Sequence, residues 1–186
     1  MYDIEIADQQ TALSIEEGKL RDVVSHLLAE EQVREAEISI ALVDNATIRE
    51  LNVQYLQHDY DTDVLSFLLE ADPPEPVPSA DSAHPAPRGA GRALSGEVIV
   101  STEMAIQMAA DYDWSPEDEL VLYLVHGLLH LCGYDDLTEP ERDVMRARER
   151  EILRHWKLVP HYAESRTSRE PSSKGAGGES AGAETQ

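Results

Sequence analysis

Two histidines and an aspartate in the last third of the sequence have the spacing of a metal site. His126 and His130 are four residues apart, so in a helix both imidazoles lie on one face and reach a single ion. Gly133 can adopt a left-handed conformation and reverse the chain, which brings Asp136 back toward them. Two nitrogens and one carboxylate oxygen leave a fourth position for water, as in a catalytic zinc site. The pattern therefore predicts one Zn²⁺ ion held by His126, His130 and Asp136.

Other assignments of these residues stay open. Asp135 competes with Asp136 as the carboxylate ligand, and the same donor set also suits Fe(II). Alternatively, both histidines are ordinary residues of a leucine-rich helix. Cys132 could supply a thiolate, although its position two residues after His130 favours a small buried side chain. The other five histidines are scattered, and we interpret them as ordinary: His26, His58, His84, His155 and His161.

The helix that carries both histidines has clear sequence boundaries. It is predicted to begin at Ser115, a capping residue followed by proline and by acidic residues that suit the positive end of the helix dipole. Gly133 is expected to end it. A second helix start follows at Thr138, in the capping box Thr-Glu-Pro-Glu. The proposed metal-binding turn therefore lies between two well-defined helices.

The rest of the chain alternates between predicted strands and helices. Polar and apolar residues alternate over 2–7 and 37–43, as they do in half-buried strands. Short apolar runs over 64–69 and 97–100 suit strands covered on both faces. Three more helices are expected, with Ser14, Asn45 and Ser101 at their starts.

The length and composition favour one folded domain without membrane or disulfide elements. The chain has 186 residues, and we place the domain at 1–162. Prolines crowd the stretch 71–95, predicted to be a flexible insertion, and the Ser-, Gly- and Glu-rich stretch 163–186 is predicted to be a disordered tail. A single cysteine excludes an internal disulfide and fits the reducing cytoplasm. Without a secretory signal or a long apolar run, we expect neither a membrane partner nor a disulfide-linked partner.

The net charge limits how the chain can bind nucleic acid. With 15 Lys+Arg against 37 Asp+Glu, the formal charge is −22, so RNA binding requires a local basic patch. Four arginines recur at every fourth position after the metal-binding turn, and such a ridge could contact RNA phosphates: Arg142, Arg146, Arg150 and Arg154. A salt-bridged, solvated helix is the alternative, because five acidic residues share this segment: Glu139, Glu141, Asp143, Glu149 and Glu151.

Three blocks of the sequence resemble the YbeY family of rRNA-maturation endoribonucleases. They are His-Gly-Leu-Leu-His-Leu-Cys-Gly-Tyr-Asp-Asp over 126–136, Thr-Asp-Val-Leu-Ser-Phe over 62–67 and Gly-Glu-Val-Ile-Val-Ser over 96–101. The resemblance implies an α+β single domain, in which a small mixed β-sheet packs against several helices and one helix carries a metalloprotease-like metal site. It also implies one zinc ion and single-strand-specific cleavage in 16S rRNA 3′-end maturation. The implied partners are ribosomal RNA and the small ribosomal subunit, with roles in ribosome assembly and quality control.

The sequence departs from the family pattern at two positions. The third metal ligand is usually a histidine, and Asp136 stands there. A carboxylate is a legitimate zinc ligand, but it makes the site more negative and a weaker Lewis acid. The family also usually has an arginine implicated in catalysis where this chain has Leu56. An arginine there would stabilise charge on a phosphate, so its absence affects turnover more than the fold, and no catalytic residue is assigned.

Three functions are compatible with these residues. Metal-dependent hydrolysis of RNA is the leading hypothesis. A zinc peptidase is the second, because the ligand spacing matches that of metzincins, but Gly127 stands where those enzymes have their glutamate base. A non-catalytic ribosome-assembly factor with a structural metal is the third, and both Leu56 and the negative charge favour it.

Overall fold

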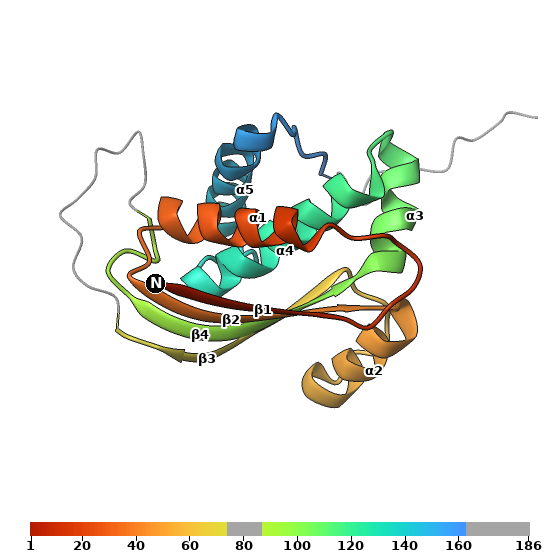
Figure 1. The fold of residues 1–186 in the computed structure, drawn as a ribbon, viewed down its shortest axis with the longest axis horizontal. Coiled ribbons are helices and arrows are strands. Elements are labelled where there is room, and N and C mark those ends of the chain that lie inside the picture. The colour runs from red at the N-terminus through yellow and green to blue at the C-terminus, as the bar shows by residue number, and fades with distance from the viewer. Residues whose placement is uncertain (74–86, 163–186) are drawn as a thin grey trace, which may run out of the picture.

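Four strands form a mixed sheet in the computed structural model, which describes residues 1–73 and 87–162 (Figure 1). The strands are β1 (Tyr2–Asp8), β2 (Glu35–Val43), β3 (Val64–Ala71) and β4 (Ala93–Ser101), in the order β1-β2-β4-β3. β2 pairs in parallel with both β1 and β4, whereas β3 pairs antiparallel with β4. The mixed sheet implied by the family resemblance is confirmed.

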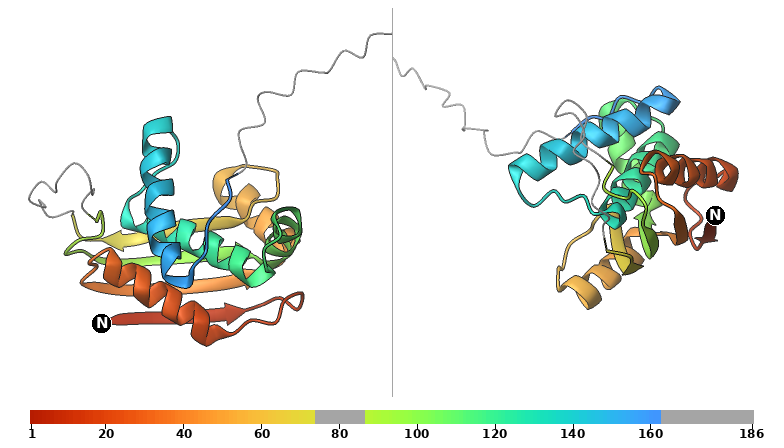
Figure 2. Two further views of the ribbon diagram at one scale, coloured as in Figure 1. Left: turned by 90° about the horizontal axis from the view of Figure 1, so that it is seen from above. Right: turned by 90° about the vertical axis from the view of Figure 1, so that its left-hand side faces the viewer.

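The helices cover the two faces of the sheet unequally (Figures 1 and 2). On one side lie α1 (Glu17–Glu30), α4 (Pro116–Cys132) and α5 (Glu139–Leu153), with α3 (Thr102–Tyr112) at one end. On the other side lies α2 (Asn45–Leu56), which packs on a small cluster around Ile48 and Leu65. A short 3₁₀ helix, η1 (Arg154–Trp156), follows α5. Of the described helices, none is long and apolar enough to cross a membrane.

α4 is the central helix of the main core. It lies on the sheet beside α1, with α5 packed against it, and most of its residues are buried. Gly127 explains how closely it approaches the strands, because a Cβ there would come within 2.8 Å of Val98 Cγ1 and 2.9 Å of Val64 Cγ2. Contacts that short do not occur between real side chains, so this position requires glycine. The close packing fixes where the histidines on α4 point.

The predicted helix starts at Asn45 and Ser101 are confirmed to within one residue, since Ser101 caps α3 and α2 begins at Asn45. The prediction that Ser14 caps a helix is wrong. α1 begins at Glu17, and the residue before it makes no side-chain cap. Leu13 and Ile15 pack against the core instead, so burial of these side chains outweighs the capping preference of the serine.

Two predictions about the strands need correction. β3 lies at the edge of the sheet. It is not covered on both faces as predicted, because Leu68 and Leu69 are 46% and 66% exposed. The predicted insertion 71–95 is also too long, since β3 includes Ala71 and β4 begins at Ala93. Residues 74–86 of that insertion, and the predicted tail 163–186, lie outside the described residues.

Candidate metal centre

Both predicted boundaries of α4 are confirmed by its capping contacts. The Ser115 hydroxyl accepts a hydrogen bond from the Asp118 N–H at 3.1 Å. At the other end Gly133 has a φ of 101°, a left-handed conformation that suits glycine. Its N–H and that of Tyr134 bond back to carbonyls of the last turn, which closes the helix and reverses the chain. The reversal brings residues 134–136 beside the face that carries the histidines.

The structure brings His126, His130 and Asp136 together. The two imidazole Nε2 atoms are 3.1 Å apart, and the carboxylate oxygens of Asp136 lie 3.9 Å from Nε2 of His126 and 4.0 Å from Nε2 of His130. Donors bonded to one tetrahedral zinc at about 2.0–2.1 Å lie about 3.3 Å apart. The three side chains therefore fit one ion, and among the described residues they are the group with this geometry.

Neighbouring residues that competed as ligands have other roles. Asp135 Oδ1 accepts the N–H groups of Asp136 and Leu137, at 2.7 and 3.1 Å, so this carboxylate shapes the turn. Cys132 is buried, and burial raises the pKa of its thiol. Neither residue belongs to the convergent group, and both of these alternatives are therefore disfavoured.

Each imidazole is held through its other nitrogen. His126 Nδ1 lies 2.7 Å from Oε1 of Glu149, a carboxylate on α5 whose side chain is 3% exposed. His130 Nδ1 lies 3.1 Å from the Tyr134 carbonyl oxygen. When each Nδ1–H donates to its oxygen, the Nε2 lone pairs are left facing the candidate site. Glu149 and the Tyr134 carbonyl therefore set the tautomers that metal binding needs.

The two histidines differ in basicity. Burial alone would lower the pKa of His126, but the hydrogen bond and charge of Glu149, with smaller contributions from Asp63 and Asp136, raise it above its ordinary value. The pKa of His130 is lowered, first by burial and then by the charge of His126. The candidate metal centre therefore has a negative electrostatic environment, in which His126 is hydrogen-bonded to the buried acid Glu149.

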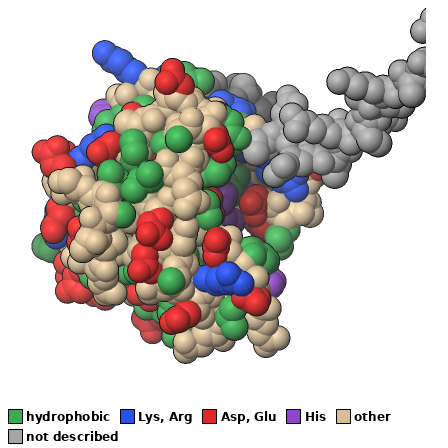
Figure 3. All heavy atoms as spheres, turned by 90° about the vertical axis from the view of Figure 1, so that its right-hand side faces the viewer, with side chains coloured by type: hydrophobic (Ala, Val, Ile, Leu, Met, Phe, Trp, Pro, Cys, Tyr) green, Lys and Arg blue, Asp and Glu red, His purple; other side chains and the backbone are tan. Residues whose placement is uncertain are grey.

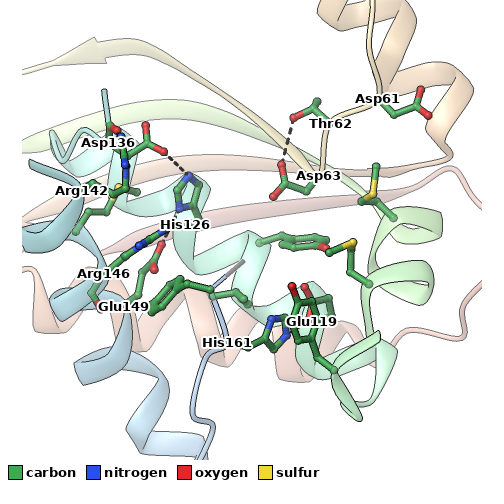
Figure 4. A pocket seen from close by; sticks show the side chains of 17 residues that line it. Asp61, Thr62, Asp63, Glu119, His126, Asp136, Arg142, Arg146, Glu149 and His161 are labelled. Atoms are coloured by element: carbon green, nitrogen blue, oxygen red, sulfur yellow. Dashed lines mark hydrogen bonds and ion pairs between the residues drawn. The ribbon is translucent and has the colours of Figure 1, made fainter. Parts of the chain in front are cut away.

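Two of the candidate ligands, His126 and Asp136, line a cleft of about 420 Å³ (Figure 4). Figure 3 shows histidine side chains recessed in a hollow of one face of the molecule. At one end of the cleft, Arg142 and Arg146 of α5 lie near Asp136. Asp63 lies on the other side of His126, and Glu119 lies further along the cleft beside His161. The cleft therefore has two arginines at the end that holds the candidate metal centre, together with the acids Asp136 and Glu149, and no arginine lines its other end.

The predicted arginine ridge lies on α5 and η1, and within the described part of the chain it is free of ion pairs. Among the described residues, no carboxylate lies within 4.0 Å of the guanidinium nitrogens of its four members, Arg142, Arg146, Arg150 and Arg154. Arg148, between them in sequence, is the one paired with acids, at 2.6 Å from Glu31 and 2.7 Å from Glu151. The salt-bridged interpretation is therefore wrong for the ridge itself. Arg146 and Arg150 lie over the ring of Tyr162, at 4.5 and 5.5 Å from its centroid, which leaves their hydrogen-bond donors without a carboxylate partner among the described residues.

Some residues of the cleft were not identified from the sequence alone. Glu149 was counted with a solvated face, yet it is 2% exposed. Its position four residues after the buried Met145 is the one signal that places it on the apolar stripe of α5. His161, interpreted as ordinary, lines the cleft and has no sequence pattern around it. Leu56 ends α2, is 46% exposed and does not line the cleft.

Comparisons with known proteins agree with the three sequence blocks. The family model of endoribonuclease YbeY matches residues 5–157. The chain is 38% identical to endoribonuclease YbeY of Salinibacter ruber over 150 residues, which cover 81% of this chain and 89% of that protein. Identity to the YbeY proteins of Desulfitobacterium hafniense and Protochlamydia amoebophila is 41% and 33%, over 75% and 86% of this chain and 81% and 96% of theirs. A solution structure from Thermotoga maritima, 21% identical, matches with a TM-score of 0.49 over 89% of this chain and 99% of that one. From the family match and these sequence identities, the chain belongs to the YbeY family of endoribonucleases.

Proposed function

We propose that this chain is a metal-dependent endoribonuclease that cleaves single-stranded RNA in 16S rRNA 3′-end maturation, acting on the small ribosomal subunit in the cytoplasm. The observation that carries the proposal is the convergence of His126, His130 and Asp136 beside a cleft that is lined by two arginines with no ion pair among the described residues. The family supplies the class of reaction, because its members are metal-dependent endoribonucleases.

We assign one Zn²⁺ ion to His126, His130 and Asp136. Two imidazole nitrogens and a carboxylate at donor separations of 3.1–4.0 Å suit tetrahedral zinc with one position left open. Fe(II) is the alternative ion for this donor set. When bound, the ion supplies Lewis-acid chemistry toward water and toward a phosphate oxygen.

Arg142 and Arg146 bind the phosphate of the RNA. Both line the cleft, and the Arg142 Nε–H donates to the Asp136 carbonyl oxygen at 3.2 Å, which holds its guanidinium beside the metal-binding turn. Charge-assisted hydrogen bonds from arginine suit phosphate oxygens and stabilise negative charge in the transition state. These residues therefore supply positive charge that Leu56 cannot.

Asp63 accepts the proton that the attacking water loses. Its Oδ1 accepts hydrogen bonds from the Val64 N–H at 2.9 Å and the Thr62 hydroxyl at 3.2 Å. Among the described residues, nothing donates to its Oδ2. The carboxylate lines the same cleft and is near enough to His126 to raise the pKa of that imidazole. A carboxylate in this position is suited to general-base catalysis.

The open geometry favours an enzyme over an assembly factor with a structural ion. Structural zinc sites are closed by four protein ligands, whereas three side chains converge here. They are accessible, with exposed fractions of 28% for His126, 27% for His130 and 42% for Asp136.

Peptide hydrolysis is disfavoured by the environment of Gly127. In metzincins the residue at this position is a glutamate base. Here the Cα of Gly127 faces Val98 and Val64 of the sheet so closely that not even a Cβ fits. A side chain at this position would point into the core rather than into the cleft.

The test is cleavage of a 16S rRNA precursor fragment by the purified, zinc-loaded chain. We expect cleavage of the single-stranded 3′ segment, protection of the same segment when it is annealed to a complementary strand, and loss of cleavage in Asp136→Ala. Asp143→Ala, an exposed acid on α5, is the control and should cleave normally. Binding to small subunits without any cleavage would support the assembly-factor function instead, and casein cleavage lost in His126→Ala would support a peptidase.

A further inference from the structure

The end of the cleft away from the arginines contains a stacked aromatic pair. The rings of Tyr112 and His161 have centroids 3.6 Å apart and an interplanar angle of 10°. Trp114 meets the His161 ring edge-on, with centroids 4.8 Å apart. Both stacked rings line the cleft. They join the C-terminal end of α3 to a segment nearly fifty residues later in the chain.

A buried acid positions this pair. His161 Nε2 lies 2.8 Å from Oε2 of Glu119, whose side chain is 2% exposed at the first turns of α4. A carboxylate this deeply buried is costly unless it is paired, so the contact fixes the imidazole against Tyr112. The segment is held a second time where the Tyr162 hydroxyl donates to the Arg146 carbonyl oxygen at 3.0 Å. The aromatic pair is therefore a built feature of the cleft, and the proposed hydrolysis does not use it.

The surrounding wall is apolar, and its charges are negative. Met104 and Met108 of α3 contribute thioethers, and Tyr123 of α4 contributes a ring that is 5% exposed. Glu119 is the acid at this end, Asp63 lies between it and the metal centre, and Arg142 and Arg146 lie at the other end (Figure 4). No arginine lines this end to bind a phosphate, whereas a flat, uncharged ring suits the aromatic and thioether wall.

We infer that this aromatic end is a subsite for one nucleobase of the RNA, next to the phosphate held at the arginine end. The inference rests on the proposed function for its ligand class. A nucleotide joins an anionic phosphate to a flat, uncharged base. The cleft likewise has arginines at one end and aromatic rings at the other. Proteins that bind single-stranded RNA commonly stack bases on tyrosine and histidine rings. The volume of about 420 Å³ is in the range of small-ligand pockets.

Binding without metal tests the subsite separately from cleavage. The sequence has two tryptophans, so in a Trp156→Phe background the fluorescence of Trp114 reports on the aromatic pair. The full chain, freed of metal with a chelator, is titrated with each ribonucleoside 5′-monophosphate and with ribose 5-phosphate as the base-free probe. We expect the nucleotides to change the fluorescence at concentrations where ribose 5-phosphate does not. Equal responses to both probes would overturn the inference.

Substitution of Tyr112 tests the ring itself. Tyr112→Leu keeps an apolar side chain and removes the stacking surface, and it should weaken nucleotide binding by about tenfold, in the range measured when a stacking ring is removed. Tyr112→Phe keeps the stacking ring and should bind nucleotides as the wild type does. Tyr55→Leu makes the same change on α2, where Tyr55 is 58% exposed on the opposite side of the sheet, and should have no effect. Unchanged binding in Tyr112→Leu would contradict the subsite.

Cleavage of an RNA with one abasic nucleotide completes the test. Moving that nucleotide through the positions beside the cut should identify one position at which its base is needed by the wild type. At that position Tyr112→Leu should cleave intact and abasic RNA equally. If cleavage occurs and no position matters, the subsite is wrong while the proposed function stands. If nucleotides bind as expected and no RNA is cut, the subsite stands and the proposed function fails.

Discussion

The charged side chains on the two sides of the metal-binding turn, residues 133–137, differ in whether they have partners within the protein. Behind the turn, Glu31 is fully buried, and its carboxylate accepts hydrogen bonds from Arg148 Nε at 2.6 Å, the Tyr134 hydroxyl at 3.2 Å and the Gly89 N–H at 3.3 Å. In front of it, Arg142 and Arg146 face the cleft without an ion pair among the described residues. Charges behind the turn are paired within the protein, whereas the two arginines in front have no carboxylate partner in the described part of the chain.

Two further arginines extend the rear network to the end of α4. Arg92 Nη1 donates to the Cys132 carbonyl oxygen at 3.1 Å, and Arg88 Nη1 donates to that of Gly133 at 3.0 Å. The last carbonyls of a helix lack intrahelical partners and carry its negative dipole end. These arginines therefore hold the chain at the point where it reverses toward Asp136. The comparison shows that arginines behind the turn are buried or hydrogen-bonded to the end of α4, whereas Arg142 and Arg146 line the cleft.

The largest expected effect on stability is at Glu31. Glu31→Ala leaves Arg148 and the Tyr134 hydroxyl without their buried partner, and removing one member of a buried ion pair costs about 3 kcal/mol or more. Glu30→Ala, at a neighbouring position with a 47% exposed side chain, should cost less than about 0.5 kcal/mol. Urea denaturation of both variants measures the difference. Equal, small losses would mean that the rear network does not stabilise the turn.

A smaller effect, on metal affinity rather than folding, is expected at Glu149. Glu149→Gln weakens the hydrogen bond that fixes the His126 tautomer, and losses of outer partners of this kind typically reduce metal affinity by about 10–100-fold. Zinc affinity is measured by competition with a chromophoric chelator. Glu151→Gln changes the charge of the same helix at an acid that contacts Arg148 instead, so it should bind zinc normally. Identical zinc affinities for the two variants would show that Glu149 does not support metal binding.

The front arginines should affect RNA binding with little change in stability. Arg142→Ala and Arg146→Ala each remove one phosphate contact, which reduces the slope of log K against log salt by about 0.7 for a single strand. Arg154→Ala is the matched control, because Arg154 belongs to the same ridge but does not line the cleft. Fluorescence anisotropy over a salt series gives the slopes. A control that lowers the slope as much as Arg146→Ala would extend the interface along the whole ridge.

The smallest effect is expected at Cys132, which lies on the buried side of the turn. Its side chain is 0% exposed and burial raises the pKa of its thiol, so little reactive thiolate forms near neutral pH. We expect no reaction with a thiol reagent until the chain is unfolded in denaturant. Fast labelling of the native chain would show that the region behind the turn opens readily.

Local rules in the sequence predicted much of the site. These rules depend on residues within one or two turns: the i, i+4 histidine pair, the glycine that ends α4, and the caps Ser115 and Thr138. The structure has His126, His130 and Asp136 together as expected. His161 could not be found this way, since packing of the segment after η1 brings it to the cleft. Glu149 has one local signal, its position four residues after Met145, but its contact with His126 depends on how α5 packs. The edge position of β3 was missed for the same reason, because strand order depends on long-range pairing.

The central claim is that one ion is held by His126, His130 and Asp136, and zinc stoichiometry tests it most directly. Asp135 and Asp136 form a matched pair, because an amide at 135 can still accept the two N–H groups of the turn. Titration of the metal-free chain should give one zinc ion for the wild type and for Asp135→Asn, and loss of stoichiometric binding for Asp136→Asn and His126→Ala. One tightly bound zinc ion in Asp136→Asn, with wild-type affinity, would contradict the account.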